Sequence, residues 1–108
     1  MKEVKKKWGK ELWLVNTDKY CSKLLYLNRG AVSSLHSHPK KMETFYCLSG
    51  SVMLTIMGKR EIMDGHTFPV TIEPGQVHQF EGKEDSVLLE VSTTHSEDDV
   101  ERIYESRG

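Results

Sequence analysis

The stretch GAVSSLHSHPKKMETFYCLSG, residues 30–50, decides the fold and carries the strongest chemical signal in the chain. Within it His36 and His38 are separated by one residue, and Glu43 follows after a further four. Side chains alternate between the two faces of a β-strand, so residues two apart point to the same side. On a strand, these two imidazoles could therefore reach one metal ion.

Outside this stretch the chain is predicted to form short strands separated by turns. The segment PGQVH at residues 74–78 reverses the chain and could bring His78 to the same site as a further ligand. Strands are predicted at residues 11–15, 22–28, 31–38, 43–48, 52–57, 61–63, 67–72, 77–81 and 86–92. About nine short strands bounded by turn residues favour a sandwich or barrel, and Pro69 favours an edge position or a bulge.

Residues 95–107 depart from the strand pattern. They are strongly charged, and Ser96 lies three residues before Asp99, as in a helix start. Three larger side chains follow at helical spacing: Val100, Ile103 and Tyr104. The pattern predicts a short C-terminal helix lying on the barrel.

Length and charge exclude several classes of protein. A chain of 108 residues fits one domain, residues 1–108, and 15 basic against 16 acidic residues provide no electrostatic surface for nucleic acid or an acidic membrane. No stretch reaches the roughly 18 apolar residues of a membrane span. The basic start MKEVKKK lacks the apolar run of a signal peptide, so we expect a cytoplasmic protein. Cys21 and Cys47 are expected to be buried thiols.

The spacing of Gly30, His36, His38, Glu43 and Gly50 matches the first conserved motif of the cupin superfamily. The second cupin motif is matched less strictly, by Gly65, Pro74, Gly75 and His78. The resemblance implies an all-β double-stranded β-helix, that is, a jelly-roll barrel. It also implies that His36, His38, Glu43 and His78 bind a divalent metal ion.

The donor set suits Zn, Mn, Fe, Co or Ni, and it leaves one or two positions for water or substrate. Nothing in the sequence selects one of these metals. The two other histidines of the second half, His66 and His95, are interpreted as structural.

A narrower resemblance covers most of the chain. The segments WGKELWLVNTDKY, LHSHPKKMETFYCLSG and VTIEPGQVHQFEGKEDSVLLEVSTTHSEDDVERI are similar to small cupins of the mannose-6-phosphate isomerase type. This resemblance implies a metal-dependent aldose–ketose isomerase acting on a sugar or a sugar phosphate.

The candidates for proton transfer or phosphate binding are Lys40, Lys41 and Glu90. Lysines in loops are usually solvated. Glu90 is expected on the outer face of its strand. Val87, Leu89 and Val91 form the apolar set of this strand and are expected to face the core, and Glu90 alternates with them.

Two other functions fit the same motif. One is a non-catalytic module that binds a metal and a small sugar, and the other is an iron-dependent dioxygenase. The resemblance also implies a homodimer. The apolar residues Trp8, Leu12, Trp13 and Leu14 could cover a partner or close their own barrel.

Overall fold

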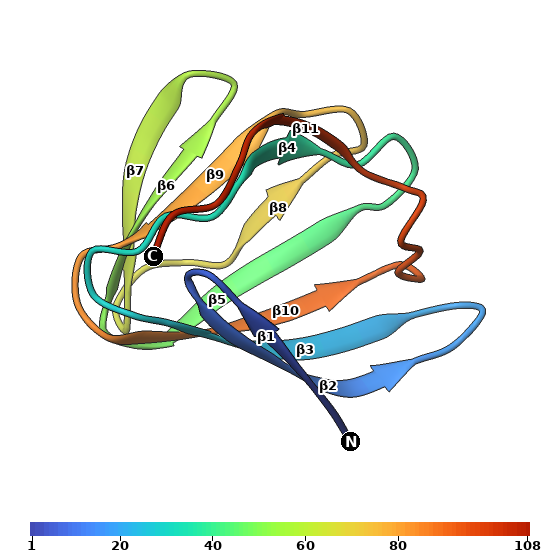
Figure 1. The fold of residues 1–108 in the computed structure, drawn as a ribbon, viewed down its shortest axis with the longest axis horizontal. Coiled ribbons are helices and arrows are strands. Elements are labelled where there is room, and N and C mark those ends of the chain that lie inside the picture. The colour runs from blue at the N-terminus through green and yellow to red at the C-terminus, as the bar shows by residue number, and fades with distance from the viewer.

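The computed structural model describes residues 1–108 and contains eleven strands and no helix. The strands are β1 Lys2–Lys6, β2 Gly9–Asn16, β3 Cys21–Leu27, β4 Leu35–Ser37, β5 Glu43–Ser49, β6 Ser51–Ile56, β7 Lys59–Asp64, β8 Val70–Ile72, β9 His78–Gly82, β10 Ser86–Ser92 and β11 Glu101–Tyr104. They form a six-stranded sheet, β1-β2-β3-β10-β5-β8, and a five-stranded sheet, β11-β4-β9-β6-β7. The two antiparallel sheets face each other (Figure 1), which confirms the predicted jelly-roll class.

The core forms between the two sheets because apolar residues occupy alternate positions of the inner strands. Every second residue of β3 is buried, as are Val52 and Leu54 in β6, and a fully buried apolar side chain contributes roughly 1.5–3 kcal/mol. The core cluster consists of Trp8, Leu25, Leu27, Ala31, Phe45, Cys47, Val52, Leu54, Met63, Ile72, Phe80 and Leu88. Four of them, Trp8, Leu25, Phe45 and Phe80, also line a pocket whose other walls are mostly polar.

The predicted strands are present, with shifted bounds. The predicted strand at residues 31–38 shortens to β4, and Val32 before it forms only isolated bridges. Pro69 directly precedes β8, which is the edge strand of its sheet, as predicted. Gly50 joins β5 to β6 at φ 85°, and a Cβ there would lie 2.6 Å from the carbonyl oxygen of Asp85. Only glycine permits this close approach.

Strand β1 was not predicted from the sequence. Its residues KEVKK alternate around a single apolar residue, Val4, which is too weak a pattern to indicate a strand. It pairs with β2 at the edge of the six-stranded sheet. Lysines on an edge strand discourage pairing with other chains. The same charged residues that obscure the strand pattern in the sequence therefore suit an edge position.

The prediction of a C-terminal helix is wrong. Ser96 and Asp99 form a turn closed by a 3.0 Å backbone hydrogen bond, and β11 then pairs antiparallel with β4. Figure 1 shows β11, in red, lying alongside β4. Ile103 and Tyr104 are 56% and 68% exposed, so no apolar helix face is buried. The strand satisfies the free backbone edge of β4, and these tertiary hydrogen bonds outweigh local helix propensity.

The apolar residues near the N-terminus have different surroundings. Trp8 is buried in the barrel's own core, Leu12 and Trp13 are half-buried, and Leu14 is 41% exposed. Cys21 and Cys47 are buried and free, as predicted. No helix capable of crossing a membrane is present.

Candidate metal centre and pocket

Three histidines converge inside the barrel. His36 lies on β4, His78 begins β9, and the two are direct partners across this strand pair. His38 follows one residue after β4 ends. One ring nitrogen from each histidine lies within 4.8 Å of the others. The structure therefore brings together the three histidines that the sequence motifs selected.

Each of the three imidazoles is oriented by a backbone carbonyl. Nδ1 of His36 donates to the carbonyl of Ser34 at 2.8 Å, Nδ1 of His38 to Asp99 at 2.7 Å, and Nδ1 of His78 to Gln76 at 3.0 Å. A carbonyl oxygen only accepts, so Nδ1 carries the proton and Nε2 keeps its lone pair. This is the orientation that metal-ligating histidines adopt.

Glu43, the first residue of β5, contacts two of these rings. Its Oε2 lies 3.0 Å from Nε2 of His78 and 3.7 Å from Nε2 of His38. Both Oε2 of Glu43 and Nε2 of His78 are buried, and neither has a hydrogen-bond partner. Two lone pairs that face each other in a buried site are unfavourable, and a cation between them would satisfy both. The residues therefore fit a divalent metal ion.

The charge state of these groups also fits a cation. Burial lowers the pKa of the His36 imidazole to about 3, so the ring is neutral and available as a ligand. Burial alone would raise the pKa of Glu43, but its contact with His78 and the charge of Lys41 lower it to about 2. Glu43 is therefore a carboxylate at neutral pH.

Lys41 connects this centre to Glu90. Its Nζ lies 3.0 Å from Oε1 of Glu43, 3.2 Å from Oε2 of Glu90 and 3.2 Å from Nδ1 of His95. Lys41 and Glu90 are each only 3% exposed. Both expectations from the sequence were wrong: the loop lysine is buried, and Glu90 faces the interior. Lys40, by contrast, is exposed and lies outside the pocket.

Glu90 points inward because β10 has an inverted pattern at this end of the barrel. Ser86, Leu88, Glu90 and Ser92 are its buried residues, whereas Val91 is 49% exposed. The apolar set that was expected in the core therefore lies on the outer face. The inner face is polar because it forms the wall of a pocket.

Sequence reasoning missed Asp99, which anchors the segment between the ligand strands. Its carboxylate accepts from the backbone amides of Lys40 at 2.8 Å and Lys41 at 2.9 Å. Its carbonyl accepts from His38, as described above, and the residue is 8% exposed. One residue thus fixes both a histidine of the cluster and the buried lysine. The Ser96–Asp99 spacing, interpreted as a helix start, was the only signal.

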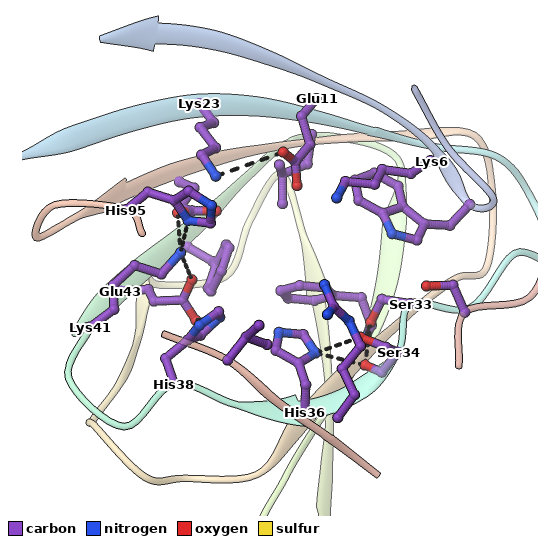
Figure 2. Close-up of a pocket in the computed structure, with 18 of the residues that line it drawn as sticks. Lys6, Glu11, Lys23, Ser33, Ser34, His36, His38, Lys41, Glu43 and His95 are labelled. Carbon is purple, nitrogen blue, oxygen red and sulfur yellow. Dashed lines mark hydrogen bonds and ion pairs between the residues drawn. The ribbon is translucent and has the colours of Figure 1, made fainter. Parts of the chain in front are cut away.

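Lys23 and Glu11 form the wall opposite His36 (Figure 2). Lys23 is 1% exposed, with its Nζ 4.2 Å from the ring centre of Trp13 and 3.7 Å from Oε1 of Glu11. Nε1 of Trp13 donates to the same carboxylate oxygen at 2.9 Å. His95, predicted to be structural, lines the pocket and stacks edge-on against Trp13.

The space between these walls is a cavity of about 90 Å³. One bound water needs roughly 10–15 Å³, so the cavity can hold a small polar molecule. The site is thus a polar pocket in a jelly-roll barrel, with a three-histidine cluster able to hold a metal at its base.

Comparison with known proteins assigns this barrel to a family. The family model described as "Cupin domain" matches residues 23–92, and the chain belongs to this cupin family. This result confirms the superfamily resemblance inferred from residues 30–50.

Two curated relatives act on sugar compounds according to their names. The chain is 29% identical over 121 residues to a D-lyxose/D-mannose isomerase of Thermosediminibacter oceani, covering 86% of this chain and 66% of that protein. It is 27% identical over 107 residues to a mannose-1-phosphate guanylyltransferase of Sinorhizobium fredii, covering 94% of this chain and 20% of that protein. The chain therefore spans just under two thirds of the first relative and a fifth of the second.

Among solved structures, KdgF from a Halomonas species superposes with a TM-score of 0.75 at 17% identity, covering 82% of this chain and 81% of that one. At this identity the similarity supports the fold alone.

Proposed function

We propose that His36, His38, His78 and Glu43 bind a divalent metal ion, and that the protein is a metal-dependent aldose–ketose isomerase. The observation that carries the proposal is the buried Lys41–Glu90 pair directly beside the histidine cluster. A site that only bound a metal would have no need for a second buried carboxylate and a buried amine. The similarity to a D-lyxose/D-mannose isomerase supports the same reaction class.

The metal, when bound, would polarise the carbonyl of the substrate as a Lewis acid. The three Nε2 atoms and Oε2 of Glu43 would hold it. Oε1 of Glu43 stays with Lys41, so this carboxylate links the metal ligands to the proton-transfer groups. Zn, Mn, Fe, Co and Ni all suit these donors.

Isomerisation of an aldose moves one proton from C2 to C1 and another from the C2 hydroxyl to the C1 oxygen. Glu90 is placed to take the carbon-bound proton and return it to the neighbouring carbon. Burial raises the pKa of its carboxyl, which favours proton uptake at this position. Nζ of Lys41 is placed to donate to the substrate oxygens and pass the second proton between them.

The pocket is lined by as many carboxylates as cations, which favours a neutral aldose over a sugar phosphate: Glu11, Glu43, Glu90 and Glu97 against Lys6, Lys23, Lys41 and Arg102. Lys41 is matched by Glu43 and Glu90, and Lys23 lies beside Glu11, so neither of these buried lysines lacks a nearby carboxylate. Lys40, which the sequence suggested as a phosphate ligand, points to solvent. Alternating amines and carboxylates suit the hydroxyls of a sugar, which both donate and accept.

The test is an assay of the metal-free protein reloaded separately with Zn, Mn, Fe, Co or Ni. We expect at least one metal form to convert D-lyxose or D-mannose to its ketose, and the phosphorylated sugars to react more slowly. If sugars stabilise the protein but are not converted, the protein is a non-catalytic binding module and the isomerase proposal is wrong. Oxygen consumption by the iron form without ketose formation would establish a dioxygenase instead.

We also propose that a second copy of the chain covers the outer face of the six-stranded sheet. Leu12, Leu24, Leu89 and Tyr46 are successive partners across four strands, which creates an apolar row on that face. Leu14, Leu48 and Val91 on the same sheet are 41–49% exposed. Sedimentation equilibrium tests this, with a dimer expected for the native chain and a monomer for Leu89→Glu.

A further inference from the structure

The wall opposite the histidine cluster contains a buried lysine that the proposed reaction does not use. Lys23 is 1% exposed, and its Nζ forms no hydrogen bond with any protein atom. Its ion-pair partner, Oε1 of Glu11, lies 3.7 Å away, which is beyond hydrogen-bond distance. A lysine has three N–H donors, and the amine of Lys23 lines the pocket without being one of the fully enclosed unpaired atoms, which are Oε2 of Glu43 and Nε2 of His78. Lys23 is therefore arranged for a partner that enters the pocket.

The surroundings of Lys23 hold its amine in place. Its Nζ lies 4.2 Å from the ring centre of Trp13, in cation–π geometry. Trp13 is held in turn by its hydrogen bond to Glu11 and by edge-on contact with His95, whose ring centre is 5.0 Å away. The amine is thus preorganised by packing, although it has no hydrogen-bond acceptor of its own.

Strand register relates this amine to the proposed reaction centre. Lys23 on β3 is the direct partner of Glu90 on β10, and Glu90 is the partner of Phe45 on β5. Neighbouring strands lie roughly 4.8 Å apart, so Lys23 lies about 10 Å across the sheet from the strand of Glu43. In Figure 2, Lys23 and Glu11 face His36 and His38 across the pocket. A sugar held at the histidines would extend its remote carbons toward Lys23.

We propose that Lys23, oriented by Trp13 and Glu11, forms a subsite that binds the hydroxyls of the aldose remote from its carbonyl. Nζ donates to a sugar oxygen, and Oε2 of Glu11, the carboxylate oxygen that is not bonded to Trp13, accepts from a sugar hydroxyl. The subsite rests on the proposed function for the direction in which the sugar lies. It makes Lys23 a specificity residue, which recognises the length of the carbon chain and takes no part in proton transfer.

The test compares a long and a short aldose on one variant. Lys23→Met retains the side chain as far as its ε position and removes the amine with its donors. For the metal-loaded protein, we expect the Kd for D-mannose, measured by calorimetry, to rise at least tenfold. The Kd for D-glyceraldehyde, which has three carbons and occupies only the metal end, should change less than twofold. In turnover, KM for D-mannose should rise much more than kcat falls.

A matched control is available on the outside of the same sheet. Lys10 also lies over an aromatic ring, that of Tyr26 at 5.1 Å, and beside a carboxylate, Glu3 at 3.1 Å. Lys10→Met should leave both Kd values unchanged. If Lys23→Met does not fold, Glu11→Gln tests the same subsite. We expect this variant to raise the Kd for D-mannose at least threefold and to leave the Kd for D-glyceraldehyde unchanged.

The outcomes separate this inference from the proposed function. Normal turnover with an unchanged Kd for D-mannose in Lys23→Met would overturn the subsite and leave the isomerase intact. Binding that depends on Lys23 without any turnover would retain the subsite and overturn the isomerase. A native protein that binds neither sugar would overturn both.

Discussion

Two segments far apart in the chain build the same candidate metal centre in different ways. The ligand segment, residues 30–50, supplies His36 on β4, His38 directly after it and Glu43 at the start of β5. The C-terminal segment, residues 93–107, supplies none of these groups, but it fixes them through Asp99. Groups that would bind the metal follow a local spacing that can be read in the sequence. Groups that hold them in place depend on tertiary contacts, and no local pattern indicates them.

The largest effect is expected from the proposed ligands. His78→Ala should abolish stoichiometric metal binding and reduce turnover by at least about 10³-fold, because the site loses a donor and Glu43 loses its neighbour. Elemental analysis after reloading measures the metal directly. His66→Ala, at an exposed position, is the control and should retain full metal content. Metal bound one-to-one in His78→Ala would refute the assignment.

Glu90 lies on the pocket wall between the two segments, and its replacement tests chemistry apart from metal binding. Glu90→Gln should lower kcat by roughly 10²–10⁴-fold, the usual contribution of a general base. Metal content should remain at one ion per chain, since the residue is outside the proposed ligand set. Glu84→Gln, on an exposed loop, should behave as the native protein. If kcat is unchanged in Glu90→Gln, another group must abstract the proton.

Asp99 tests whether the C-terminal segment really positions the ligand segment. Asp99→Ala leaves the amides of Lys40 and Lys41 without their acceptor, which should destabilise the fold by about 1–3 kcal/mol. Loss of such outer support typically weakens metal affinity about 10–100-fold. Denaturant unfolding and metal titration measure the two effects. If Asp99→Ala and the exposed Asp98→Ala have the same stability and the same metal affinity, the C-terminal segment covers the site without positioning its ligands.

The smallest effect concerns the pH dependence of stability at His95. Burial, with the charges of Lys23 and Lys41, lowers the pKa of this imidazole to about 4, from about 6.5 in the unfolded chain. Between these values the unfolded chain binds the proton and the folded chain does not, so stability falls as the pH drops through this range. Relative to His95→Gln, the native protein should lose of order 1 kcal/mol between pH 7 and pH 5. Denaturant unfolding of the two metal-free proteins measures this effect. If their free energies of unfolding change with pH in the same way, the prediction is wrong.

The sequence predicted most of the strands and the three clustered histidines because both depend on short-range alternation and spacing. Glu90 was assigned to the wrong face because apolar residues were expected to point inward, whereas at this end of the barrel the interior is a polar pocket. The helix was predicted because the Ser96–Asp99 spacing resembles a capping box. The carboxylate of Asp99 instead binds amides some 58 residues away in the chain. Lys23 gave no signal, since its burial follows from strand pairing alone.

The hydrogen bond from His38 to the carbonyl of Asp99 spans 61 positions of the chain. During synthesis, all three histidines leave the ribosome before the residue that orients the second of them. At that stage His38 lacks the acceptor that fixes its tautomer, whereas His36 and His78 have their acceptors in Ser34 and Gln76, two residues before each ring. For the proposed metal site, we therefore expect full ligand geometry only after the C-terminal segment has docked on His38.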